Sequence, residues 1–130
     1  DRLSFGMSGS LYIEEPEAHL YPTAQKDILE LFIYVANTIN SDGLYITTHS
    51  PYILTVLNNL ILANDVKEKQ NIFDKDLLVP FEEVRAYYIA DGAARDLRDN
   101  ENRLILADNL DKVSEQTAMD FDKLLDMKYD

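Results

Sequence analysis

Residues 11–22 read LYIEEPEAHLYP, a short apolar run that stops at two acids and a proline. An apolar run of this length, closed by turn-forming residues, is typical of a buried strand whose C-terminal end opens into a loop. Neighbouring side chains on an extended strand point in opposite directions, so Glu14 and Glu15 at the strand tip can serve two different purposes. This stretch therefore predicts a buried strand that presents two carboxylates at its end.

The residues that follow predict a helix and then a second strand. From Pro22 to Asn40 the apolar residues recur at spacings of three and four, which indicates an amphipathic helix, and proline is favoured at such a start. Residues 41–43 supply a turn, and Leu44–Thr48 is rich in β-forming residues. A strand–helix–strand unit is normally a right-handed crossover between parallel strands, which places both strand ends at one edge of the sheet. We therefore expect His49 to lie beside the two acids.

The next part of the chain predicts a second helix and then a surface segment. Ser50 is suited to cap a helix and Pro51 to begin one, and the helix should carry its apolar residues towards the core and end near Asn64. Residues 65–83 are rich in charged residues and show no period. This pattern indicates a surface excursion in which residues 77–79 touch the core.

The last part predicts a β-hairpin and a closing helix. Val84–Ala90 is strand-like, Asp91-Gly92 is a strong signal for a two-residue turn, and Ala93–Leu97 can return antiparallel. Residues 104–106 are ambiguous. Val113–Met127 carries apolar residues along one helical face, which predicts an amphipathic helix that closes the fold. The tyrosines of the predicted strands are interpreted as strand and core aromatics: Tyr12, Tyr45, Tyr87 and Tyr88.

The composition excludes several classes of protein. The 130 residues suffice for one domain or one lobe, and no apolar run approaches the roughly 18 residues of a membrane span. Without cysteine, no disulfide framework or thiolate metal site can form. The 24 acidic and 12 basic side chains give a net charge of −12, and the basic residues are interleaved with acids, so direct nucleic-acid binding is not expected. The chain opens on Asp1 without a signal pattern, so we expect a cytoplasmic protein and a piece of a longer chain.

Two adjacent carboxylates at a strand end suit metal-assisted hydrolysis. One can hold a hydrated Mg²⁺, an ion that takes few protein carboxylates and keeps several waters, while the other orients an attacking water. A pair of solvated acids before a turn is the simpler interpretation of the same residues. Alternatively, Glu17 and His19 could complete a metal site with Glu14 or Glu15, because carboxylate and imidazole suit Zn²⁺ and Mn²⁺.

Two segments carry a family resemblance. LYIEEPEAHLYP at residues 11–22 resembles the Walker B and D-loop segment of ABC-type ATPases, and YITTHSPYIL at residues 45–54 resembles their switch-histidine segment. The closest likeness is to bacterial ATPases of the overcoming-lysogenization-defect family and their AAA-named relatives. VRAYYIADG at residues 84–92 and NLDKVSEQTAMDFDKLL at residues 109–125 look like the strand and closing helix of such chains.

The resemblance implies roles for individual residues. Glu14 falls where the family has its Walker B acid, which binds Mg²⁺ usually through water, although many ABC proteins have aspartate there. Glu15 falls on the catalytic position that polarises the hydrolytic water, and His49 on the switch histidine that contacts the γ-phosphate. Glu17 and His19 occupy the D-loop region, which crosses the dimer interface and lies near the nucleotide in the family. ATP and Mg²⁺ are the implied cofactors.

One part of an ATPase is missing from the sequence. A phosphate-binding loop needs a G-x-x-x-x-G-K-S/T pattern, so that backbone N–H groups and a lysine cradle the phosphates, and no Gly-Lys pair occurs in the chain. Leu3-Ser4-Phe5-Gly6 is similar to the family's signature motif, but it lies closer to Glu14 than the family usually places it.

Taken together, the sequence predicts an α/β fold: a partial P-loop NTPase lobe of the ABC type with parallel strands and crossover helices, then a β-hairpin and a C-terminal helix. Residues 1–130 would form the single C-terminal lobe of an ATPase whose N-terminal lobe carries Walker A. That lobe and a second head, joined head to head on ATP, are the expected partners. The piece alone would be inactive. The alternatives are a non-hydrolysing interaction or dimerisation module, and a metal-dependent nuclease that uses Glu14, Glu15, Glu17 and His19.

Overall fold

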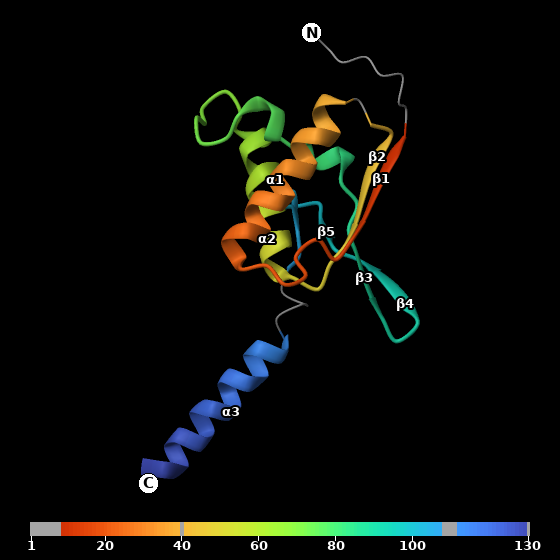
Figure 1. The fold of residues 1–130 in the computed structure, drawn as a ribbon. Helices are drawn as coiled ribbons and strands as arrows, with labels where there is room; N and C mark the ends of the chain where they lie inside the picture. Colours follow the sequence, from red (N-terminus) through yellow and green to blue (C-terminus); the bar gives the residue numbers. More distant parts are fainter. Residues whose placement is uncertain (1–8, 40, 108–111, 130) are drawn as a thin grey trace.

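The first half of the chain is a strand–helix–strand–helix unit. The computed structural model describes residues 9–39, 41–107 and 112–129. Strand β1 spans Ser10–Glu14, helix α1 Pro22–Thr38, strand β2 Gly43–Thr47 and helix α2 Pro51–Asp65. The two strands pair in parallel, and both helices lie on one side of them (Figure 1). The predicted α/β crossover is therefore confirmed.

The helix boundaries follow from local chemistry. Both helices begin with proline in their first turn, where its missing N–H is not needed. Helix α1 buries Gln25, Leu29 and Ile33, which are four residues apart and so lie on one face. It ends at Thr38, two residues before the predicted end. The Thr38 hydroxyl donates to the Tyr34 carbonyl at 2.8 Å. Such a side-chain hydrogen bond competes with the backbone hydrogen bonds of the helix.

The core is built mainly from the two helices and three later segments. Leu60 and Ile61 of α2 have no exposed surface. The other buried members of the cluster come from both helices and from the chain beyond them: Leu29, Ile33, Ile53, Leu54, Val79, Phe81, Leu97 and Ile105. Leu44 and Ile46 of β2 pack against this cluster, so the sheet shows one face to the core.

The opposite face of the sheet corrects one prediction. The Tyr12 and Tyr45 rings stack on each other with centroids 4.7 Å apart and planes 8° apart, and their exposed fractions are 76% and 53%. Side chains alternate along a strand, so the apolar neighbours that face the helices turn these tyrosines away from them. Tyr88 does pack against the core, whereas Tyr87 is exposed. Three of the four tyrosines are thus not core residues.

The charged segment after α2 is more ordered than its composition indicates. It contains two short 3₁₀ turns, η1 at Lys75–Leu77 and η2 at Phe81–Glu83. Val79 is buried, as the sequence predicts, and Phe81 is buried although no pattern pointed to it. The Asn37 side-chain amide donates to the Asp76 carbonyl at 2.7 Å, which fastens the segment to α1.

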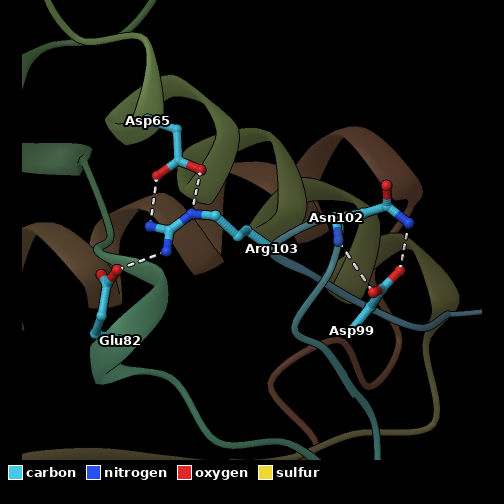
Figure 2. Close-up of polar contacts among 5 residues, drawn as sticks. All are labelled: Asp65, Glu82, Asp99, Asn102 and Arg103. Carbon is cyan, nitrogen blue, oxygen red and sulfur yellow. Dashed lines mark hydrogen bonds and ion pairs between the residues drawn. The ribbon is translucent and has the colours of Figure 1, made fainter.

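Arg103 joins three separate segments. Its guanidinium makes two hydrogen bonds of 2.9 Å to Asp65 at the end of α2 and a 2.7 Å ion pair with Glu82 of η2 (Figure 2). The hydrogen bonds from Arg103 hold the pKa of Asp65 below its ordinary value. Arg98 and Arg103 both place their guanidinium groups over the Phe81 ring. In the turn just before Arg103, Asp99 accepts hydrogen bonds from Asn102.

Two antiparallel pairs follow. Strand β3 spans Tyr87–Ala90 and pairs with β4 at Ala93–Asp96, which confirms the hairpin. It begins later than predicted because Val84 closes the η2 turn. The ambiguous residues form β6, Leu104–Ile105, which pairs with β5, Arg98–Asp99.

The hairpin turn depends on left-handed backbone at Asp91 and Gly92, whose φ angles are +52° and +75°. We expect Gly92→Ala to destabilise the hairpin by about 1–2 kcal/mol, because a Cβ disfavours this conformation. A Cβ at Gly92 would meet no atom within 4 Å, so the loss would report backbone conformation alone. Amide hydrogen exchange in β3 and β4 should accelerate roughly 5- to 30-fold. Gly9→Ala is the matched control, since a Cβ there is equally unobstructed and its φ is not left-handed; equal effects of the two variants would contradict the prediction.

The C-terminal helix α3 spans Lys112–Tyr129, close to the predicted range. The prediction that it closes the fold is wrong for its described side chains, because Phe121 and Leu124 are 62% and 64% exposed and Leu125 is 40% exposed. Figure 1 shows the helix extending away from the α/β unit. An amphipathic period predicts an apolar face but not the surface that covers it. No helix in the described part of the chain has both the length and the apolar character to cross a membrane.

Candidate functional site

The carboxyl ends of β1 and β2 meet at one edge. Glu14 lies opposite Thr47 in the parallel register, and the Glu15 N–H donates to the Thr47 carbonyl at 2.8 Å. Glu14 is exposed on the same face as Tyr12. Glu15 has a φ of +46°, an uncommon backbone conformation for a residue with a Cβ, which turns the chain out of the strand. Glu15 therefore lies outside the extended strand geometry on which the predicted divergence of the two acids rests.

Glu15 and His49 are in direct contact. The His49 Nε2 atom lies 2.9 Å from Glu15 Oε1, and the side chains are 88% and 46% exposed respectively. The structure thus brings together two of the predicted site residues, which are more than 30 positions apart in the sequence. Both are open to solvent, so a ligand can reach the carboxylate and the imidazole.

Glu17 makes a contact that the sequence does not predict. Its Oε1 atom accepts a hydrogen bond of 2.9 Å from the His49 backbone N–H, which joins the loop after β1 to the loop after β2. Burial acts to raise the pKa of Glu17. The Thr48 hydroxyl and the His49 N–H favour the charged form more strongly, so the pKa of Glu17 lies below its ordinary value of 4.5.

This shift has a sign that can be tested. A carboxyl whose pKa is lowered by folding stabilises the protein above its unfolded pKa, and that contribution is lost as the pH falls through the lowered value. We expect Glu17→Gln to reduce the free energy of unfolding at pH 7, and the gap to wild type to close on acidification below pH 4.5. Urea unfolding at several pH values measures this gap. Thr48→Val removes a hydrogen bond that lowers the pKa of Glu17, so in a Thr48→Val background the gap caused by Glu17→Gln should close at a higher pH. A gap that stays constant or widens in acid would contradict the assignment.

His19 does not join a metal cluster. It is exposed in the turn after Glu15, with a φ of +63°, and the turn is closed by hydrogen bonds from the Ala18 N–H to the Glu15 carbonyl and from the Leu20 N–H to the Glu17 carbonyl. Within residues 9–39, 41–107 and 112–129, no three His, Asp or Glu side chains are grouped so as to hold a metal ion.

Gln25 is a residue that the sequence reasoning missed. It is buried in the first turn of α1, its amide Nε2 donates to the Leu20 carbonyl at 3.0 Å, and its Oε1 accepts from the Ser50 hydroxyl at 2.5 Å. Ser50 stands at the cap position of α2, but its side chain makes no capping hydrogen bond, which corrects the predicted cap. A glutamine on the same helical face as Leu29 and Ile33 was the available signal.

A shallow hollow lies elsewhere, between α1 and η1. It has a volume of about 290 Å³ and is lined by acidic residues, among them Asp27 and Asp74, together with Tyr34 and Leu77. None of the predicted site residues lines it. The proposed signature motif at residues 3–6 falls outside the described residues.

Comparison with known proteins adds one finding. Residues 7–54 match the model of a family described as an AAA ATPase domain. The match covers less than half of the chain and includes β1, α1, β2 and the start of α2. No match was found among curated proteins or among solved structures. The α/β arrangement is consistent with a partial P-loop lobe. The segment that carries Glu15 and His49 is therefore similar to AAA ATPases, which supports ATP binding and hydrolysis in a general sense.

Proposed function

We propose that this chain provides the hydrolytic half of an ABC-type ATPase head, related to the overcoming-lysogenization-defect group. The observation that carries the proposal is the 2.9 Å contact between Glu15 and His49 at the shared edge of two parallel strands. Ligands of open α/β sheets bind outside the carboxyl ends of the strands, which is where this pair lies. The same residues fall inside the segment that matches the ATPase family.

Each residue at the edge receives a role. Glu15 orients the attacking water and accepts its proton, since its carboxylate is accessible and already lies 2.9 Å from His49 Nε2. His49 contacts the γ-phosphate and reports its presence to the loop that Glu17 holds. Glu14 is an exposed carboxylate at the strand tip, an oxygen donor of the kind that Mg²⁺ accepts through a bound water. Mg²⁺ would supply charge neutralisation on the phosphates.

The rest of the ATPase is proposed from what the sequence lacks. The 130 residues contain no Gly-Lys pair, so the phosphate-binding loop would come from an N-terminal lobe of the same cytoplasmic protein. Two such heads would join on ATP, with Glu17 and His19 in the loop that faces the second head. The chain by itself would then bind ATP poorly and turn none over.

The proposal is tested on the full-length protein. Phosphate release from ATP in the presence of Mg²⁺ should be detected, and it should disappear when Mg²⁺ is chelated. Divalent-metal-dependent cleavage of DNA without nucleotide would instead support the nuclease. ATP-independent assembly with no turnover would support the interaction module.

A further inference from the structure

Two buried polar side chains lie next to the Glu15–His49 pair. Gln25 and Ser50 are the buried polar residues of the described chain, with 8% and 6% of their surface exposed. Gln25 belongs to the first turn of α1, and Ser50 is the residue between His49 and α2. Neither has a place in the roles proposed above.

The Gln25 amide connects the two loops that carry the reacting groups. Its Oε1 accepts from Ser50, the immediate neighbour of His49. Its Nε2 donates to the carbonyl of Leu20, the last residue of the turn that begins at Glu15. One planar amide on a 17-residue helix therefore bonds to both loops, in addition to the direct hydrogen bond from the His49 N–H to Glu17.

The position of His49 has to be set through its main chain. Its side chain is 88% exposed, so no surrounding wall of protein holds the ring. On one side the Glu17 carboxylate accepts a hydrogen bond from the His49 N–H. On the other side the Gln25–Ser50 hydrogen bond fixes the next residue. A buried amide or hydroxyl that loses its hydrogen-bond partner costs free energy, so the Gln25 amide and the Ser50 hydroxyl act as a unit.

We infer that Gln25, acting through Ser50 and Leu20, is a positioning residue that holds Glu15 and His49 in register for the reaction. The inference rests on the proposed ATPase function for its kinetic consequence, but not for its structural one. Misplacement of a reacting group by about 1 Å can lower a rate roughly 100-fold. Loss of the amide should therefore act on the chemical step and not on ATP binding.

The kinetic test uses the full-length protein. Gln25→Met keeps the length of the side chain but removes both hydrogen bonds, and Ser50→Ala removes one of them. We expect each to lower kcat roughly 10- to 100-fold with KM within about twofold of wild type. The double variant should lose no more than either single one, since both break the same unit. Ser50→Thr keeps the hydroxyl, so this variant should retain the kcat that Ser50→Ala loses.

A control separates positioning from a general loss of stability. Ile53→Val trims a buried residue in the first turn of α2 without touching the amide, and it should leave kcat unchanged. The inference is overturned if Gln25→Met and Ser50→Ala both keep kcat within about twofold of wild type, or if Ile53→Val lowers kcat as much. Failure of the ATPase proposal itself looks different, since the wild-type protein would then release no phosphate from ATP.

A structural readout does not depend on turnover. In a crystal structure of the full-length Gln25→Met variant, we expect the His49 Nε2 and Glu15 Oε1 atoms to move out of hydrogen-bond range from their present 2.9 Å. Retention of that distance would overturn the inference. If Gln25→Met does not fold, Ser50→Ala provides the same measurement, because it deletes a single oxygen atom.

Discussion

Replacing Glu15 by glutamine in the full-length protein is expected to lower ATP turnover by about 100- to 10,000-fold while ATP binding and head assembly survive. The amide has nearly the volume of the carboxylate, and its oxygen can still accept the 2.9 Å contact from His49, so the local geometry should persist. It cannot take a proton from the attacking water or present a full negative charge to it. Chemistry should therefore fail in a site that still binds its ligand.

Glu14→Gln should give a different result. Glu14 ends β1 on the exposed face of the sheet, and its proposed role is to hold a water of the Mg²⁺ shell. A neutral amide attracts a hard cation less, and loss of such an outer partner commonly costs roughly 10- to 100-fold in metal affinity. The affinity for ATP should then fall in Mg²⁺ but change little without it.

The two variants are compared by steady-state phosphate release and by calorimetric titration with ATP, each with and without Mg²⁺. Near-normal turnover of Glu15→Gln would refute the assignment of the hydrolytic carboxylate. Equal losses of Mg²⁺-dependent affinity in both variants would show that the adjacent acids do not divide the work as proposed.

Leu60→Ala is the change expected to affect stability most. Leu60 lies on α2, has no exposed surface and belongs to the buried apolar core. Truncating a buried leucine removes its transfer free energy and leaves a cavity, which together destabilise by about 2–5 kcal/mol. Such a loss is a large share of the stability of a small domain.

Leu62→Ala is a matched control on the same helix, because Leu62 is 51% exposed. Helix propensity favours alanine slightly in both variants, so the difference between them isolates burial. Urea unfolding monitored by circular dichroism measures both. A loss at Leu62 equal to that at Leu60 would contradict the placement of the core.

The sequence by itself determined the elements whose cause is local. The apolar run before Glu14, the period of α1 and the Asp91-Gly92 turn each depend on residues within a few positions of one another. The parallel pairing of the two strands then brought His49 to the same edge as the acids, because parallel strands end together. This is why Glu15 and His49 could be paired from the sequence alone.

Only the tertiary structure decided which distant groups touch. Glu17 holds the His49 N–H and Gln25 meets Ser50 because two loops and the start of a helix converge, and no spacing in the sequence encodes that meeting. Phe81 is buried in a charged segment because it packs into the apolar core, and two arginines from beyond the hairpin lie over its ring. Periodicity reports the face of one element, whereas hydrogen bonds between elements depend on register and packing to within fractions of an ångström.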